Sequence, residues 1–377
     1  MRSGNLHCIS TGDNGTVSER HTRWVLHVDL DQFLAAVEVL RRPELAGLPL
    51  IVGGRGDPTE RAVVSTASYE ARALGVGSGM PLRTAARKAP DAVILPLDPP
   101  AYTAASEQVM QTLRGLGATV QVLGWDEAFL GVRTDDPEAF AATVQEAVLE
   151  STRLHISVGI GDTTVRAKNA TGFGKPRGVF RLTTDNWLEV MGERPTTALW
   201  GVGSKISKRL SAHGIHTVAE LASADPDGLV AEFGPRMGPW YAALGRGDGA
   251  TTVDDTPWVA RGHSREKTFQ QNLTQPDQVE LAVRQLTAQV LEDVAAEGRP
   301  VIRLTLKVRY APFFTKTLSR TLPTATATGD ADVVLVAALA LAGKLDPQRE
   351  VRLLGLRAEL TMPDADPVEH TPTRSRF

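Results

Sequence analysis

Two short segments place acidic residues where they could do chemistry, although the segments lie far apart in the chain. The first, WVLHVDLDQFLAAVE, is an apolar run that carries Asp29 and Asp31. The second, GWDEAFLGV, carries Asp126 and Glu127 between two short apolar stretches. We expect Asp29 to end one strand and the Asp126-Glu127 pair to follow a tight turn between two others. Neighbouring strand ends of one sheet would then bring three carboxylates together.

Such a cluster of carboxylates is stable only if a cation neutralises it. Mg²⁺ fits best, because it prefers carboxylate oxygens together with the phosphates of a substrate. Two such ions, about 3.5–4 Å apart, activate an attacking hydroxyl and stabilise the leaving oxygen of a phosphoryl transfer. Taken singly, Asp29 and Asp126 would more often be caps or turn residues, which aspartate favours. Asp31 is expected to be the N-cap of the helix that follows it.

The elements that must position these acids alternate between strands and helices. Apolar patterns predict strands over residues 24–30, 119–123, 127–132 and 155–161, and helices over 32–40, 102–116, 137–153 and 164–172. Residues 198–247 change to short helices joined by glycine-containing turns. A last region combines long strands with helices over 277–297 and 330–345. The order predicts an α+β, multidomain fold whose first sheet is ferredoxin-like or palm-type.

The length and composition of the chain indicate several soluble domains. A chain of 377 residues exceeds the size of one hydrophobic core. The single cysteine, Cys8, cannot form an internal disulfide, which fits a reducing cytoplasm. The longest apolar run, residues 333–343, is too short to span a bilayer, so no membrane association is expected. Residues 1–23 are expected to be a flexible leader.

The net charge of −3 argues against a general nucleic-acid binder, but one region departs from it. Between residues 299 and 320 there is no acidic residue and there are six basic ones: Arg299, Arg303, Lys307, Arg309, Lys316 and Arg320. The strand VIRLTLKVRY alternates there, with Ile302, Leu304, Leu306, Val308 and Tyr310 predicted on a core face and Val301, Arg303, Thr305, Lys307 and Arg309 on the other. The second face could follow a phosphate backbone; the alternative is a solvated surface strand.

Six segments in one order carry a resemblance to a known family. They are VDLDQFLAAVE, SYEARALGVGSGMP, GWDEAFLGV, SVGIGDTTVRAKNATGFGKPRG, GVGSKISKRLSAHGIHTVAELA and HSREKTF. Over roughly residues 24–362 the chain resembles the Y-family DNA polymerases, the lesion-tolerant class that includes bacterial DNA polymerase IV. The resemblance implies a right-hand polymerase, with a ferredoxin-like palm (24–32 and 99–175), small fingers (33–98), a helical helix-hairpin-helix thumb (176–247), a linker (248–257) and an α/β little-finger domain (258–362).

The same resemblance implies roles for individual residues. Asp29 and Asp126 would bind two Mg²⁺ ions, which Mn²⁺ could replace, with the Leu30 carbonyl as a further ligand and Glu127 as the third catalytic acid. The incoming nucleotide would contact Gln32, Phe33, Leu34, Thr66, Tyr69, Arg72 and Lys168. The spacing of Tyr69 and Arg72 on a predicted helix makes them face the same way, although Arg72 alone would read as a surface residue. DNA would contact Gly201, Gly203, Lys205, Lys208, Arg303, Lys307 and Arg309.

Three departures from the family pattern bear on activity. Leu34 stands where the family usually has a second aromatic ring that excludes a 2′-hydroxyl, so we expect ribonucleotides to be accepted beside deoxynucleotides. The alternative is that Leu34 fills space and a neighbour supplies the gate. Gly124-Trp125 precede the acidic pair, and Thr163-Thr164 stand where Asn-Lys is common. None of these changes removes a metal ligand.

The sequence therefore predicts a cytoplasmic, monomeric, low-fidelity polymerase of the translesion type. Its partners would be primer-template DNA, deoxynucleotides and ribonucleotides. Residues 363–377, expected to be a flexible tail, have no clear clamp-docking motif, so sliding-clamp binding is expected to be weak or absent. One alternative is a non-catalytic DNA-binding scaffold of the same fold. A palm-type nucleotide cyclase is another, but it would need neither a helix-hairpin-helix nor a basic strand face.

Overall fold

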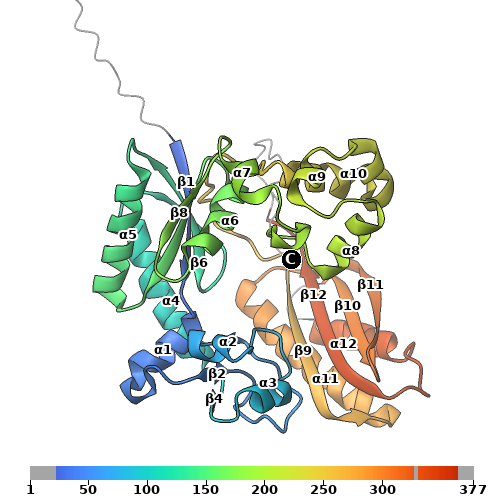
Figure 1. Ribbon diagram of the computed structural model, residues 1–377. Coiled ribbons are helices and arrows are strands. Elements are labelled where there is room, and N and C mark those ends of the chain that lie inside the picture. The colour runs from blue at the N-terminus through green and yellow to red at the C-terminus, as the bar shows by residue number, and fades with distance from the viewer. Residues whose placement is uncertain (1–22, 327–329, 364–377) are drawn as a thin grey trace, which may run out of the picture. The chain divides into compact units, whose positions relative to one another are not determined.

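The computed structural model describes residues 23–326 and 330–363, which form two compact units. The first unit contains the described residues up to Gly47 together with Asp98–Asp255, and the second contains Leu48–Leu97 and the described residues from Thr256 onward. Figure 1 shows their elements along the chain. The predicted leader up to residue 22 and the predicted tail from residue 364 lie outside the described residues.

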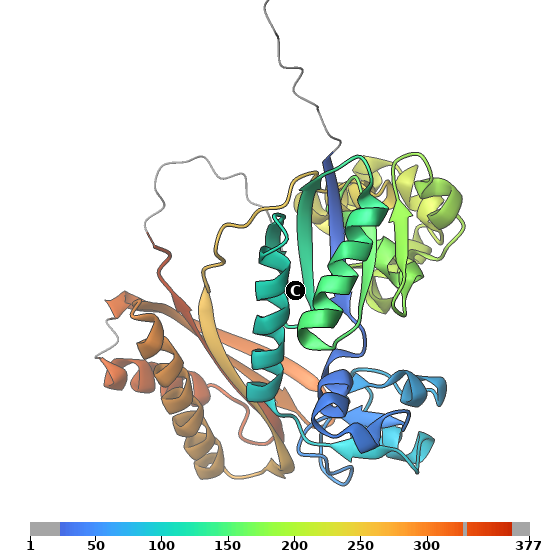
Figure 2. The same ribbon diagram turned by 90° about the vertical axis from the view of Figure 1, so that its left-hand side faces the viewer.

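A five-stranded sheet organises the first unit, in the order β5-β6-β1-β7-β8. Its central strand, β1, pairs antiparallel with both β6 and β7, whereas β7 and β8 are parallel. Residues 25–28 of β1 are all buried, because helices pack on both faces of the sheet. Figures 1 and 2 show α4 and α5 on one face and α6 on the other. The strands are β1 (Arg23–Leu30), β5 (Thr119–Val122), β6 (Glu127–Arg133), β7 (Ile156–Gly161) and β8 (Val179–Leu182).

Three of the four helices around this sheet begin at polar caps. Asp98, Asp136 and Thr163 each accept a hydrogen bond from a backbone N–H of the first turn, and proline follows both aspartates. The four helices are α1 (Phe33–Arg41), α4 (Pro99–Arg114), α5 (Pro137–Thr152) and α6 (Thr164–Gly174), and a short 3-10 turn, η1 (Pro43–Leu45), follows α1. The strand β8 has no counterpart among the predicted elements.

Short helices complete the first unit, as predicted for residues 198–247. They pack around the buried side chains of Leu182, Trp187, Leu210 and Leu221. The longest, α10, is kinked at Gly234, whose φ of 84° is one that glycine adopts without strain. The elements are α7 (Trp187–Met191), η2 (Thr196–Ala198), α8 (Ser204–Ala212), α9 (Val218–Ala222) and α10 (Pro226–Gly245).

The second unit contains two further sheets. A small one, in the order β3-β2-β4, packs with two short helices; its elements are β2 (Leu50–Val52), β3 (Thr66–Ala67), α2 (Tyr69–Ala73), α3 (Leu82–Lys88) and β4 (Val93–Leu95). The larger sheet has the order β11-β10-β12-β9, and α11 and α12 share its core. These elements are β9 (Gly262–Leu273), α11 (Pro276–Glu297), β10 (Val301–Tyr310), β11 (Phe314–Thr326), α12 (Ala331–Ala342) and β12 (Val351–Leu360).

The predicted alternation of β10 is right for most of the strand and wrong at its start. Leu304, Leu306, Val308 and Tyr310 are buried, as expected. Val301, however, is buried, while Ile302 is only partly so. The register with both neighbouring strands shifts between Val301 and Arg303, and such a bulge moves the preceding residues to the opposite faces. In the described part of the chain, no helix is both long and apolar enough to cross a membrane.

Candidate metal centre

The register of the central sheet places the predicted carboxylates side by side. Asp29, near the end of β1, is paired with Glu127 at the start of β6. The backbone N–H of Leu30 donates to the carbonyl oxygen of Asp126 at 2.8 Å, which ties the turn before β6 to the end of β1. Antiparallel pairing therefore brings together acids that are distant in sequence.

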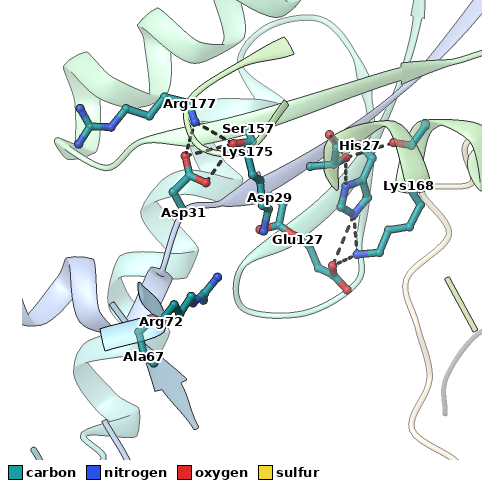
Figure 3. Close-up of polar contacts among 12 residues, drawn as sticks. His27, Asp29, Asp31, Ala67, Arg72, Glu127, Ser157, Lys168, Lys175 and Arg177 are labelled. Atoms are coloured by element: carbon teal, nitrogen blue, oxygen red, sulfur yellow. Dashed lines mark hydrogen bonds and ion pairs between the residues drawn. The ribbon is translucent and has the colours of Figure 1, made fainter. Parts of the chain in front are cut away.

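Two lysines approach these acids, and only one of them was predicted. Lys168 Nζ, from α6, donates to Glu127 Oε2, and Lys175 Nζ lies 2.5 Å from Asp29 Oδ1 (Figure 3). Lys175 directly follows the end of α6, within the segment GFGKPRG of a family-like motif. A basic residue just after a helix that packs on the sheet of the predicted acids was the signal that could have found it.

The charges at the site shift the pKa values of two acids in opposite directions. Partial burial and the negative charges of Asp29 and Glu127 raise the pKa of the Asp126 carboxyl. Burial alone would also raise the pKa of Glu127, but His27 and the Lys168 ammonium lower it to about 2. Glu127 is therefore ionised at neutral pH, and the carboxylates carry negative charge that a cation could neutralise further.

His27 is a residue of this site that sequence reasoning missed. It is fully buried in β1, two positions before Asp29, so both side chains point to the same face of the strand. Its Nε2 lies 3.4 Å from Glu127 Oε2, and burial lowers the pKa of the imidazole. Among the described residues, the group whose possible ligand atoms all lie within 4.8 Å of one another comprises His27, Asp29 and Glu127, without Asp126.

The predicted role of Asp31 as a helix cap is wrong. The N-cap of α1 is Gln32, whose φ of 45° is left-handed and whose side chain forms no cap hydrogen bond. Asp31 is buried instead and accepts hydrogen bonds from Ser157 Oγ at 2.9 Å and from the backbone N–H of Arg177 at 2.8 Å. Figure 3 shows this bridge. Asp31 therefore fixes the end of β1 to β7 and to the segment after α6.

Leu34 lies in the first turn of α1 and is only 7% exposed. Next to it, the ring centre of Phe33 lies 6.5 Å from that of Tyr102. The ring centre of Tyr102 in turn lies 6.2 Å from that of Trp125. The Tyr102 hydroxyl donates to buried Glu38 at 2.8 Å, so this ring is fixed in place. Trp125 itself is 42% exposed, directly before Asp126.

The other predicted nucleotide contacts belong to the second unit and are described within it. Thr66 lies in β3, and Tyr69 and Arg72 lie together on α2, with the guanidinium 5.2 Å from the centre of the phenol ring. Arg72 Nε also donates to the carbonyl oxygen of Ala67 at 2.9 Å (Figure 3). The two side chains share a face, as their spacing predicts.

The predicted thumb contacts surround the start of α8. Gly201 has a φ of 91°, and a side chain there would meet the Trp240 ring at 2.8 Å. Gly203 is the N-cap of α8, and Lys205 and Lys208 are exposed on that helix. Within the described residues no side chain caps this helix start, Lys205 lies in the first turn and Lys208 lies one turn later, an arrangement that suits a phosphate.

The basic face of β10 is partly neutralised by its neighbours, which the sequence of that strand could not reveal. Arg303 lies 3.5 Å from Glu359 of β12, and Lys307 lies 2.6 Å from Glu266 of β9. Arg309 instead donates to Thr315 Oγ1 at 3.0 Å. Of the three predicted contacts on this strand, Arg309 has no carboxylate partner among the described residues.

Arg309 belongs to a patch that was missed, which we call the arginine–phenylalanine patch. It comprises Arg61, Arg309, Phe313, Phe314, Arg349 and Arg352. Burial and the nearby charges of Arg61 and Arg309 lower the pKa of Arg352. Phe313 and Phe314 are 67% and 52% exposed, and guanidinium groups lie 4.8 and 4.7 Å from their ring centres. Exposed rings beside cations that have no carboxylate partner among the described residues are typical of nucleic-acid surfaces.

Comparison with known proteins identifies the family of this chain. Residues 28–172 match the model described as impB/mucB/samB family, and residues 260–368 match the model of that family's C-terminal domain. The chain belongs to this family. A relative from Mycobacterium tuberculosis, DNA polymerase IV 2, is 51% identical over 90% of this chain and 98% of its own. DNA polymerase IV of Methanoculleus marisnigri is 36% identical over 90% of this chain and 94% of its own.

Two solved structures match this fold. A Y-family DNA polymerase chimera of Dbh and Dpo4 matches with a TM-score of 0.78 at 24% identity, over 89% of this chain and 98% of that one. DinB from Sulfolobus solfataricus matches with a TM-score of 0.57 over the same shares, also at 24% identity. The mixed α/β architecture predicted from the sequence, with its palm sheet and its additional sheet domain, is confirmed.

Proposed function

We propose that this chain is a template-directed DNA polymerase of the translesion type, which extends a primer by metal-dependent nucleotidyl transfer. The observation that carries the proposal is the pairing of Asp29 with Glu127, beside Asp126, in a sheet of the Y-family fold. The relatives named DNA polymerase IV, matched over nearly their whole length, support it.

The donor set fits a magnesium centre. Asp29, Asp126, Glu127 and the carbonyl oxygen of Leu30 would offer hard oxygen ligands, which Mg²⁺ and Mn²⁺ prefer. Burial and the repulsion from Asp29 and Glu127 raise the pKa of Asp126, and a bound cation would relieve this repulsion. When bound, two such ions would activate the primer hydroxyl and stabilise the leaving pyrophosphate.

The other residues would bind and orient the substrates. Lys168 and Lys175, now paired with the acids, would be free to contact the triphosphate once these acids bind cations, and Tyr69 and Arg72 would contact it from the fingers. Residues 24–32 and 99–175 would be the palm, 33–98 the fingers, 176–247 the thumb and 258–362 the little finger. The thumb lysines and the arginine–phenylalanine patch would bind DNA without reading its sequence.

A primer-extension assay tests this function. The intact protein should extend a primer on a template in the presence of Mg²⁺ and deoxynucleotides. If no Mg²⁺-dependent extension occurs at any nucleotide concentration, the polymerase proposal fails and a DNA-binding scaffold is the better description.

We further propose that the enzyme accepts ribonucleotides as well as deoxynucleotides. Leu34 is buried in the first turn of α1, where an aliphatic chain is smaller than the aromatic ring common in the family. Loss of about 3 kcal/mol of steric discrimination corresponds to more than roughly a hundredfold in substrate choice. The test compares kcat/KM for both nucleotide types in the parent and in Leu34→Phe. The idea fails if the parent rejects ribonucleotides as strongly as the variant does.

A further inference from the structure

The segment after α6 forms a tight turn that carries Lys175, one of the two lysines at the candidate metal centre. Lys175 Nζ lies 2.5 Å from Asp29 Oδ1 (Figure 3). The backbone N–H of Gly178 donates to the carbonyl oxygen of Gly174 at 2.7 Å, which closes the turn. A side chain at Gly178 would lie 2.4 Å from that carbonyl oxygen, so only glycine fits there.

Arg177, inside this turn, has an unusual backbone conformation. Its φ of 60° is left-handed, which is uncommon for residues other than glycine, asparagine and aspartate. Arg153 has a similar φ of 62°, but it is the C-cap of α5, where a left-handed residue is common. The C-cap of α6 is Lys175, two residues before Arg177. A left-handed arginine beyond a helix cap persists only where the surrounding structure holds it.

Three side chains hold the peptide groups on both sides of Arg177. Its backbone N–H donates to Asp31 Oδ2 at 2.8 Å and to Ser157 Oγ at 2.9 Å. Ser157 Oγ itself donates to Asp31 Oδ1 at 2.9 Å, and both residues are buried. The carbonyl oxygen of Arg177 accepts from Gln145 Nε2 at 3.0 Å. The guanidinium is exposed and points away from these groups (Figure 3), so they restrain the backbone of Arg177 and not its side chain.

We propose that Asp31 is a positioning residue, which holds the turn after α6 so that Lys175 Nζ stays within reach of Asp29 and of the triphosphate of the incoming nucleotide. This inference rests on the function proposed above for Lys175. Without its hydrogen-bond partners, residue 177 would return to one of the more common φ values. Because α6 and β8 fix the two ends of the turn, this change would displace the residues between them, including Lys175.

The first test measures nucleotide binding without catalysis. A primer that ends in a dideoxynucleotide blocks the chemical step, so the Kd of a deoxynucleotide can be measured with the complex of protein, DNA and Mg²⁺. Asp31→Ala should raise this Kd about tenfold, the loss expected for one charge-assisted hydrogen bond from Lys175. In a Lys175→Met background, Asp31→Ala should add less than about twofold.

Two outcomes of this titration would overturn the proposal. One is an unchanged Kd in Asp31→Ala, and the other is an equal rise in both backgrounds, which would mean that Asp31 does not act through Lys175. If the wild type neither binds a deoxynucleotide nor extends a primer, the proposed function fails, and this inference fails with it. A wild type that does both, with an Asp31→Ala variant that equals it, refutes this inference alone.

A rescue experiment separates positioning from a general loss of packing. Glycine adopts a left-handed φ without strain, so Arg177→Gly combined with Asp31→Ala should bring the Kd back to within about threefold of wild type. Arg153→Gly relieves the same kind of strain at the C-cap of α5 and is the matched control, which should restore nothing. Rescue by both substitutions, or by neither, would overturn the proposal. If Asp31→Ala does not fold, Ser157→Ala replaces it, with an expected rise in Kd of about threefold, because it removes one of two acceptors of the same N–H.

Discussion

The candidate metal centre and the arginine–phenylalanine patch differ in whether their charged side chains form ion pairs. In the first unit, Asp29 and Glu127 each have a lysine partner, and a buried histidine contacts one of these lysines. In the second unit, Arg61, Arg309 and Arg352 lie near one another, and none forms an ion pair with a carboxylate within the described residues. The acids of the metal centre are therefore paired with lysines, whereas these arginines of the patch have no carboxylate partner among the described residues.

This difference follows from what each site would bind. Small cations and a triphosphate need ligands held in place, and pairs of opposite charge hold them until a ligand replaces one partner. A nucleic-acid strand needs unpaired positive charge over a long surface, because its affinity comes from replacing the counterions of many phosphates. Changes in the candidate metal centre should therefore affect chemistry without affecting DNA binding, and changes in the patch should do the reverse.

The largest effect is expected at the compensated site. Asp126→Asn should lower the extension rate on the order of a thousandfold or more, because it removes a charge that a catalytic cation requires. Affinity for primer-template DNA should stay within about twofold, since the proposed contacts to DNA phosphates are made by other residues. Extension rates and fluorescence anisotropy measure the two quantities. Glu150→Gln, an exposed position on α5, is the matched control, and a comparable loss there would contradict the assignment.

The next effect concerns the uncompensated charges. Arg352→Ala should weaken DNA binding at low salt and reduce the slope of log affinity against log salt by about one unit, since one phosphate contact is lost. Arg284→Ala on α11 is the control, because Arg284 is already paired with Glu280 at 2.7 Å. An unchanged salt slope in Arg352→Ala, or an equal change in Arg284→Ala, would remove the contrast between the two sites.

The exposed rings should distinguish single strands from duplexes. Only unpaired bases offer free faces for stacking, at about 1–3 kcal/mol per base. Phe313→Ala should therefore weaken binding of an oligothymidine by about tenfold and affect a blunt duplex less. Val336→Ala, another exposed apolar position in this unit, should leave both affinities unchanged. Equal losses for the two DNA forms would mean that the ring does not stack on bases.

The sequence predicts the contacts of a site residue well when the residue that it contacts lies in the same segment of the chain. The strand ends that carry Asp29 and Glu127 and the shared face of Tyr69 and Arg72 follow from local patterns. Local patterns cannot reveal contacts that the sheets create. The acids that neutralise β10 come from β9 and β12, and the partners of Asp31 come from β7 and the segment after α6.

His27 shows the same limit most clearly. In the sequence it is one polar residue inside an apolar strand, which alone indicates only that its ring will be buried with a partner. Its contacts depend on α6 packing on β1 with Thr171 and Lys168 on the facing side. The two misplaced residues at the start of β10 have a different cause, because a bulge is a property of strand pairing.

The smallest effect concerns a compensated acid away from both sites, Asp162, which follows β7. It accepts hydrogen bonds from Thr184 N and Oγ1 and from Arg166 Nη1, at 2.9, 2.7 and 2.9 Å. Burial opposes ionisation, but these donors lower the pKa of Asp162 below its ordinary value. The stabilisation by ionised Asp162 is therefore complete above the pKa of the unfolded chain, about 4, and is lost as pH falls through the pKa of the folded protein.

Asp162→Asn should cost about 1 kcal/mol of unfolding free energy at pH 7, and the difference from wild type should shrink below pH 4. Urea unfolding across pH measures it, and a difference that grows on acidification would show that the charged form does not stabilise the fold.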